Sequence, residues 1–153
     1  LDSHDVSRFL TLCGGDRARM EQAVLFQMSF PGMPCVFYGD EKGLEGASEN
    51  EYRRPMDFGR PNGLEEAYRR MIALRKEHPA LRHGDFQTVL AQGALFLCRR
   101  SAAEESLLLC WNAGGEALPV PGLPKDALPL LQKGWKGGLL EGRGYAVFQI
   151  EKS

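Results

Sequence analysis

The sequence predicts an α/β segment followed by a small antiparallel β-sandwich, and a change of pattern along the chain indicates both parts. Up to about residue 82, two runs with helical spacing enclose one short apolar run and a long polar connection. Beyond it, short strand-like runs alternate with glycine-rich turns. The 153 residues, 43% of them apolar, suffice for one full domain or two small ones. We therefore predict two domains, residues 1–82 and residues 83–153.

The first predicted helix runs from Asp16 to about Phe30. Asp16 is suited to cap its N-terminus, and Pro31-Gly32 ends it. The spacing of its inward positions follows a helical period at Met20, Ala23, Val24, Gln27 and Met28.

The run Pro34–Tyr38 predicts a short strand. Its residues show no alternation with polar side chains, which is typical of a strand covered on both faces in a parallel sheet. The polar connection from Gly39 to Pro61 is rich in glycine and proline, and its length is typical of loops that carry function.

A second helix is predicted to begin after Asn62, whose side chain can cap it, with Glu65 completing a capping box. His78-Pro79 ends this helix. One apolar stripe lies along it, formed by Leu64, Ala67, Tyr68, Met71, Ile72 and Leu74. Strand, loop and helix in this order form one βα unit of an α/β sheet.

The second domain is predicted to consist of short antiparallel strands. Turn signals at Asn112–Gly115 and at Gly137-Gly138 separate them. The predicted strands are Phe86–Leu90, Ala94–Arg99, Ser106–Trp111, Ala117–Val120 and Tyr145–Ile150.

Composition excludes several classes of protein. A net charge of −1 offers no attraction to nucleic acid or to an anionic membrane. No apolar run has the length of a membrane span, which is about 18 residues. The scattered Cys13, Cys35, Cys98 and Cys110 form no CxxC pair, so we expect buried free thiols and no metal site, in a reducing compartment such as the cytoplasm.

Three motifs occur in the first domain: LDSHDVSRFLTLCGGD from Leu1 to Asp16, QMSFPGMPCVFYG from Gln27 to Gly39, and YRRPM from Tyr52 to Met56. They resemble, in order and spacing, strand seven, strand eight and the following loop in the barrel of the α-amylase family of glycoside hydrolases. The neopullulanase and cyclomaltodextrinase branch is the most similar. The resemblance implies the last strand and helices of a (β/α)₈ TIM barrel followed by the family's C-terminal sandwich.

The resemblance also implies roles for individual residues. Asp5 matches the family's third catalytic carboxylate, which binds sugar hydroxyls and stabilises an oxocarbenium-like transition state. His4 matches a sugar-binding histidine, and Arg53 an arginine that reaches the sugar. Glu49 is a further candidate for substrate binding, although Glu49-Asn50-Glu51 replaces the branch's usual Asp-Pro-Asp pattern.

Other charged residues leave alternatives open. Arg8 is expected to brace the active-site loop through an ion pair, with a surface role as the alternative. Arg54 suits either sugar contact or a solvated loop. Asp40 and Glu41 are adjacent, so an extended backbone directs them to opposite faces and they do not flank one glycosidic bond. We expect them to cap the loop, with sugar contact by Asp40 as the alternative.

The family takes its nucleophile and acid/base from strands four and five of the barrel. The chain is therefore expected to be part of a retaining α-glucan hydrolase and to be inactive alone. Its partners would be an α-glucan oligosaccharide, the missing N-terminal barrel portion and, through the exposed strand edge, a second copy of the chain. The alternative is a non-catalytic carbohydrate-binding or structural sandwich, for which Trp135 is the most plausible exposed ring and Trp111 a core residue.

Overall fold

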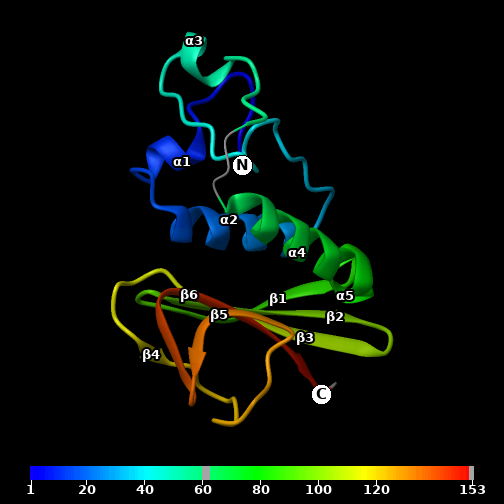
Figure 1. Ribbon diagram of the computed structural model, residues 1–153. Coiled ribbons are helices and arrows are strands. Elements are labelled where there is room, and N and C mark those ends of the chain that lie inside the picture. The colour runs from blue at the N-terminus through cyan, green and yellow to red at the C-terminus, as the bar shows by residue number, and fades with distance from the viewer. Residues whose placement is uncertain (60–62, 152–153) are drawn as a thin grey trace. The chain divides into compact units, whose positions relative to one another are not determined.

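The computed structural model describes residues 1–59 and 63–151, and the chain divides into two compact units. Unit 1 comprises Leu1–Met28 and Met33–Ala73, and unit 2 comprises Ser29–Gly32 with the chain from Leu74 onward. Each unit has its own arrangement of elements, labelled in Figure 1. The boundary proposed after residue 82 stays a prediction.

Unit 1 contains helices joined by long loops. The predicted first helix is confirmed as α2, Arg17–Ser29, and Asp16 Oδ1 accepts hydrogen bonds from the amides of Ala18 and Arg19 at 3.0 and 3.1 Å. Two short helices were not predicted: α1, Phe9–Leu12, and α3, Glu49–Tyr52. Each is only four residues long, too short for a helical period to be visible in the sequence.

The predicted strand at Pro34–Tyr38 is wrong, because these residues adopt no regular structure. A strand requires a partner ladder, and every strand pairing among the described residues is antiparallel and lies in the unit 2 sheet. Two carbonyls of this segment accept hydrogen bonds from groups outside any strand. Gln27 Nε2 donates to Cys35 O at 2.7 Å, and Asp40 N donates to Phe37 O at 3.2 Å.

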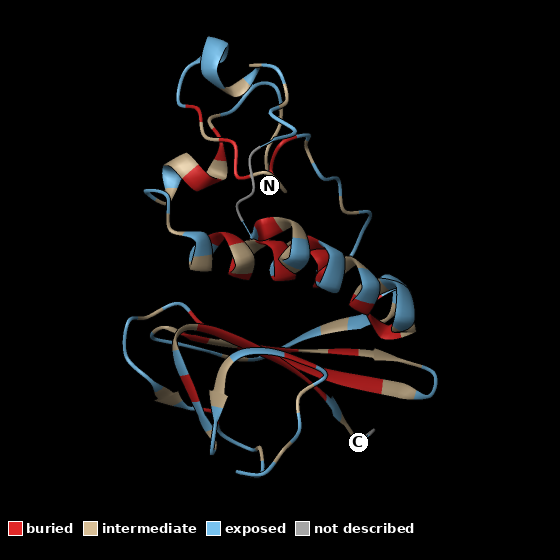
Figure 2. Cartoon of the chain, viewed as in Figure 1, coloured by how far each residue is buried: buried red, intermediate tan, exposed pale blue. Residues whose placement is uncertain are grey.

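The second predicted helix is confirmed as α4, Leu64–Glu77. Its proposed cap, Asn62, lies outside the described residues. The predicted stripe is buried at four positions, Leu64, Tyr68, Met71 and Leu74, and Figure 2 shows buried positions along one side of the helix. His78 ends the helix, and a further helix, α5, Pro79–His83, follows with proline in its first turn.

Unit 2 contains a six-stranded antiparallel sheet in the order β1-β2-β3-β6-β4, with β5 also paired to β6. Helix α5 contacts β2 and β3. All five predicted strands are confirmed, and β5 was not predicted. Three of them, β1, β3 and β6, extend beyond their predicted bounds, β2 begins one residue later and ends three later, and β4 is only two residues long. The strands are β1 Asp85–Gln92, β2 Leu95–Ala102, β3 Glu105–Asn112, β4 Leu118–Pro119, β5 Leu131–Lys136 and β6 Leu139–Ile150.

The described strands form one hydrogen-bonded sheet, so a second sheet, which a sandwich requires, is not seen among them. Strand β6 is twelve residues long and pairs with β3 along its second half and with β4 near its start. Between these parts lies Gly142-Arg143-Gly144, where Arg143 has φ 61°. A glycine is required at 142 because an added Cβ would overlap the carbonyl of Gly115.

One hydrophobic cluster of unit 2 lies on one face of this sheet. It consists of alternate residues of β2, β3 and β6, Leu140 of β6 among them, together with Val120. Residues on the opposite face of β3 and β6, such as Leu107, Leu109 and Val147, are buried as well. Trp135 packs against this cluster: its ring meets Phe148 edge to face at 4.9 Å, and Nε1 donates to Ala127 O at 3.0 Å. The prediction of Trp135 as an exposed ring is therefore wrong, whereas Trp111 is a core residue as predicted, 5% exposed.

The four cysteines are free thiols, as predicted. Cys98 and Cys110 are buried, and desolvation raises the pKa of each thiol to about 12. Cys35, however, is exposed, so the expectation of burial is wrong there, because the loop that carries it is not covered as a central strand would be.

Candidate active site

The four residues predicted to act at the site lie together in unit 1. His4 and Asp5 form a turn just before α1, Glu49 begins α3, and Arg53 follows the end of α3. Almost fifty residues of chain separate the two pairs, and the side chain of Arg53 connects them.

Arg53 uses three nitrogens of its guanidinium. Nε donates to the carbonyl of His4 at 2.8 Å, Nη2 contacts Asp5 Oδ1 at 3.2 Å, and Nη1 contacts Glu49 Oε1 at 3.1 Å. The planar, fork-like guanidinium suits several acceptors at fixed angles, which a lysine ammonium does not. The two carboxylates are thus held on either side of one cation.

The cluster remains open to solvent. The side chains of His4, Asp5 and Glu49 are each about two-thirds exposed, at 66%, 65% and 65%, and Arg53 is 45% exposed. His4 Nε2 lies 3.2 Å from Asp5 Oδ2. Carboxylate acceptors, imidazole nitrogens and guanidinium donors are the groups that bind vicinal sugar hydroxyls, so the cluster is chemically suited to a sugar.

A buried arginine lies beneath this cluster. Arg8 is fully buried, and its Nη1 donates to Asp40 Oδ1 at 2.8 Å and to Tyr38 O at 2.7 Å. Nη2 donates to Tyr52 O at 2.9 Å. The guanidinium carbon also lies 4.3 Å from the centre of the Phe37 ring. The prediction that Arg8 braces the loop through an ion pair is confirmed, and the alternative of a surface role is wrong.

Asp40 is the carboxyl partner of Arg8 and is 2% exposed. Sugar contact by Asp40 is contradicted by this burial, and Glu41 caps the loop as predicted, with Oε2 accepting from Gly39 N at 3.0 Å. Desolvation, reinforced by the neighbouring Asp2 carboxyl, raises the pKa of Asp40 to about 8 despite the opposing effect of Arg8. The carboxyls of Asp2 and Asp40 therefore lie close enough to influence each other.

The short helix α3 places Glu49 and Arg53 one turn apart. Ser48 and Glu51 form a capping box, with Glu51 Oε2 accepting from the amides of Ala47 and Ser48 at 2.8 and 3.0 Å. These hydrogen bonds lower the pKa of the exposed Glu51 carboxyl. The pattern Ser-x-x-Glu at 48–51 is the sequence signal that would have predicted α3 within the long loop.

The structure also shows a contact that sequence reasoning missed. Tyr38, a residue of the predicted strand, donates its hydroxyl to Arg54 O at 2.9 Å. Nothing in the sequence spacing indicates this contact, because sixteen residues of irregular chain separate the two. The choice between sugar contact and a solvated position for Arg54 stays open.

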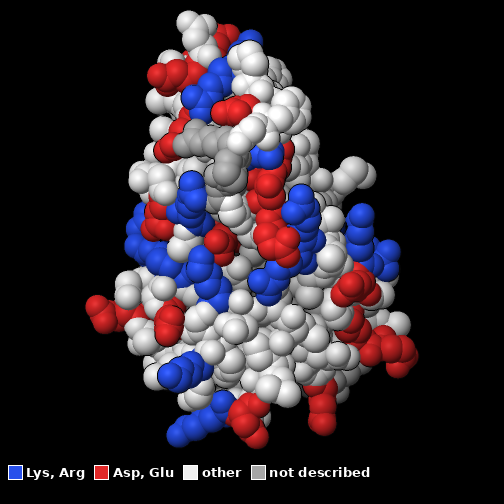
Figure 3. Space-filling view, viewed as in Figure 1, with Lys and Arg blue, Asp and Glu red and all other residues white. Residues whose placement is uncertain are grey.

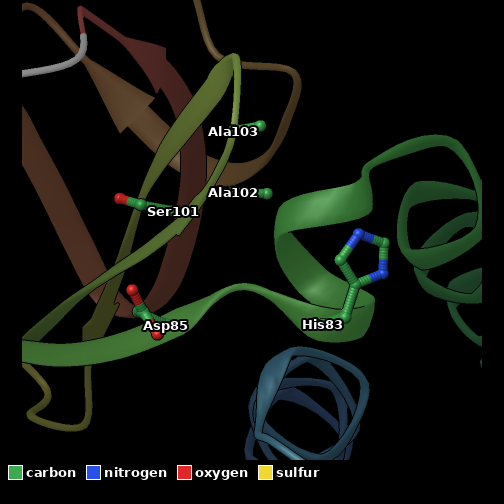
Figure 4. A pocket seen from close by; sticks show the side chains of 5 residues that line it. All are labelled: His83, Asp85, Ser101, Ala102 and Ala103. Atoms are coloured by element: carbon green, nitrogen blue, oxygen red, sulfur yellow. The ribbon is translucent and has the colours of Figure 1, made fainter.

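Unit 2 has a separate concavity of about 420 Å³ between α5 and the sheet, lined by His83, Asp85, Ser101, Ala102 and Ala103 (Figure 4). His78 is engaged elsewhere, with Nδ1 2.5 Å from Glu105 Oε1. Among the described residues, no three His, Cys, Asp or Glu side chains are grouped closely enough to hold a metal ion.

Charged side chains of both signs are intermixed on the face shown in Figure 3. In the part of the chain that the structure describes, no helix has the length and apolar character needed to cross a membrane.

Comparison with known proteins identifies the family. Residues 1–63 match the family model of the α-amylase catalytic domain. Over 152 residues the chain is 35% identical to a cyclomaltodextrinase of Geobacillus thermopakistaniensis, covering 96% of this chain and 25% of that protein. The chain belongs to the α-amylase family. It is also 40% identical over 121 residues to neopullulanase 2 of Thermoactinomyces vulgaris, covering 76% of this chain and 21% of that protein.

Solved structures of related enzymes have a similar fold over nearly the whole of this chain. An acarbose-soaked debranching enzyme from Nostoc punctiforme superposes with a TM-score of 0.83 at 33% identity, covering 98% of this chain and 33% of that one. An α-amylase from Geobacillus thermoleovorans, complexed with acarbose, gives a TM-score of 0.81 at 26% identity, covering 100% and 38%. The chain thus spans only a quarter to two-fifths of the length of these proteins and of the cyclomaltodextrinase.

Proposed function

We propose that His4, Asp5, Glu49 and Arg53 form the substrate-binding side of the cleft of a retaining α-glucan hydrolase. The observation that carries this proposal is the position of Arg53, which joins the His4-Asp5 turn to Glu49 in one solvent-open cluster. The family membership of residues 1–63 and the names of the relatives supply the reaction class.

Asp5 is the transition-state-stabilising carboxylate in this proposal. An ionised carboxylate accepts two hydrogen bonds from neighbouring sugar hydroxyls, and its charge favours the oxocarbenium-like transition state. The contact with the Arg53 guanidinium at 3.2 Å orients the Asp5 carboxylate. In this proposal Asp5 binds the sugar and stabilises the transition state, and does not break the bond.

We further propose that unit 1 is part of a (β/α)₈ barrel whose remaining strands supply the nucleophile and the acid/base. Such a barrel requires about 250 residues, and the matched relatives are several times longer than the 153 residues of this chain. The upstream barrel portion is therefore the obligatory partner of this chain.

The substrates we propose are α-linked glucans: maltodextrin, cyclodextrin, pullulan or starch oligosaccharides. They follow from the names of the relatives, which include cyclomaltodextrinase, neopullulanase and amylopullulanase.

The proposal is tested with Asp5→Asn in the complete enzyme that contains this chain. Loss of an interaction formed mainly in the transition state lowers kcat by about 100-fold or more and leaves KM within about threefold. Glu66→Gln is the matched control, since Glu66 is exposed on α4 and forms only a 3.8 Å pair with Arg69. Wild-type kcat in Asp5→Asn, measured by release of reducing sugar from maltodextrin, would refute the role.

A carbohydrate-binding sheet has little support. Trp111 and Tyr145 are buried and Trp135 packs on Phe148, so these three rings form no exposed stacking platform.

A further inference from the structure

We propose that Arg8 and Tyr38 are positioning residues that hold Arg53 in place by binding the backbone carbonyls on either side of it. This inference rests on the proposed function of the Arg53 cluster and adds residues to which neither the family match nor the relatives assign a role.

The two contacts flank Arg53 symmetrically in sequence. Arg8 Nη2 donates to Tyr52 O at 2.9 Å, and the Tyr38 hydroxyl donates to Arg54 O at 2.9 Å. The amides on either side of the Arg53 Cα are held as well, since Arg53 N donates to Glu49 O at 3.2 Å and Arg54 N donates to Glu51 O at 3.4 Å. Together these contacts leave the backbone of Arg53 little freedom to rotate. The side chain therefore leaves the backbone in a set direction.

The two donors are themselves fixed to each other. Arg8 is fully buried, donates to the carbonyl of Tyr38 at 2.7 Å and pairs with Asp40 at 2.8 Å. Its guanidinium carbon lies 4.9 Å from the Tyr38 ring centre. A buried arginine with a charged partner and several acceptors is among the most rigid groups that a loop region offers.

Arg8 also anchors the other half of the cluster. It lies three residues after Asp5 in the chain, and its own amide donates to Gly46 O at 2.9 Å. Arg8 thus holds the segment after Asp5 through its backbone amide, and the segment that carries Arg53 through its buried side chain. These contacts help two residues forty-eight positions apart to meet.

Arg53 needs such support because it is half exposed. Its side chain is 45% exposed and its carboxylate partners are about two-thirds exposed, and solvent-exposed ion pairs contribute only about 0–1 kcal/mol. The flexible side chain loses up to about 2 kcal/mol of rotamer entropy when it is ordered. The ion pairs alone therefore do not fix the Arg53 side chain. The fixed backbone restricts its orientation further.

The test uses Tyr38→Phe in the complete enzyme, since this change removes one hydroxyl and keeps the ring. We expect kcat/KM on maltooligosaccharides to fall about three- to tenfold, with an unchanged midpoint of thermal unfolding. Tyr68→Phe is the matched control: its hydroxyl is buried, has no hydrogen-bond partner in the described part of the chain, and contacts neither flanking carbonyl. This control is expected to keep wild-type kcat/KM.

A double-mutant cycle shows whether Tyr38 acts through Arg53. In an Arg53→Ala background, Tyr38→Phe is expected to have no further effect on kcat/KM, because there is no side chain left to position. Additive effects of the two changes, or wild-type activity of Tyr38→Phe, would overturn the inference. Arg8→Lys keeps the positive charge but loses the planar guanidinium with its several donors. It is likewise expected to lower kcat/KM when Arg53 is present and to have no further effect in the Arg53→Ala background.

Failure of the proposed function gives a different result. If Asp5→Asn and Arg53→Ala both retain wild-type activity, the cluster is not part of the site and the proposed function is wrong. If they lower activity while Tyr38→Phe does so equally in both backgrounds, only the positioning role is wrong.

Discussion

At the scale of single residues, the most unusual group is Asp40, which is buried between Arg8 and the carboxyl of Asp2. Exclusion of water and the nearby Asp2 carboxyl disfavour the charged form of Asp40, whereas Arg8 favours it. The pKa of Asp40, raised from 3.8 to about 8, expresses this competition. Asp40, which contacts the Arg8 side chain that holds the segment of Arg53, therefore changes charge near neutral pH.

This raised pKa predicts a pH-dependent stability. Between pH about 4 and about 8 the folded chain retains a proton on Asp40 that the unfolded chain has released, so stability falls as the pH rises through this window. Asp40→Asn retains the shape of the group and removes the titration. Urea unfolding at pH 5 and pH 8 should show wild type losing more than about 1 kcal/mol relative to Asp40→Asn.

A stability difference between the two proteins that stays constant from pH 5 to pH 8 would contradict this assignment. Such a constant difference would show that Asp40 is ionised in the folded chain throughout this range and that the pair with Arg8 dominates.

At the scale of elements, Glu105 connects helix α5 to the sheet. It begins β3, pairs with His78 at 2.5 Å, and accepts a hydrogen bond from Ala80 N at 2.9 Å, one of the unpaired amides at the start of α5. Glu105→Ala is expected to lower the free energy of unfolding by about 1–2 kcal/mol. The neighbouring Glu104 is exposed, so Glu104→Ala is the control and should remain within about 0.5 kcal/mol of wild type.

Equal, small effects of the two glutamate substitutions in urea unfolding would show that Glu105 does not hold α5.

The bend in β6 depends on Gly142. A Cβ at this position would overlap the backbone of Gly115, and a backbone atom does not move aside as a flexible side chain does. Gly142→Ala is expected to cost more than about 2 kcal/mol of stability. Gly115→Ala is the matched control, because a Cβ there has no atom within 4 Å. Thermal unfolding midpoints that fall equally for both variants would refute this account of the bend.

At the scale of the whole molecule, the chain by itself is expected to release no reducing sugar from maltodextrin or cyclodextrin. Retaining cleavage requires two carboxyl groups about 5–5.5 Å apart, one of them protonated. In our proposal these two groups come from barrel strands outside this chain, and the carboxyls of Asp5 and Glu49 are both engaged by Arg53. Co-expression with the barrel portion of the parent enzyme should produce the activity. Sugar release by the purified 153-residue chain would contradict the prediction.

Local patterns predicted much of the fold and the candidate residues. Helices α2 and α4 follow from apolar spacing, and the strands of unit 2 follow from apolar runs between turn signals. Predictions from local sequence patterns were wrong where the conformation or burial of a residue depends on a segment distant in sequence. Pro34–Tyr38 has the composition of a central strand but no strand beside it, and Trp135 lies among polar and glycine residues yet packs on Phe148.

The sequence by itself determined the family and the residue types of the site. The histidine-aspartate motif and the two motifs that follow it are contiguous stretches of sequence, so they can be recognised without a structure. Only the tertiary structure decided that Arg53 joins Asp5 to Glu49, and that Arg8 and Tyr38 support it. These contacts join residues up to forty-eight positions apart in irregular loops. Periodicity carries no information about such loops, and the buried arginine and its acceptors define their geometry.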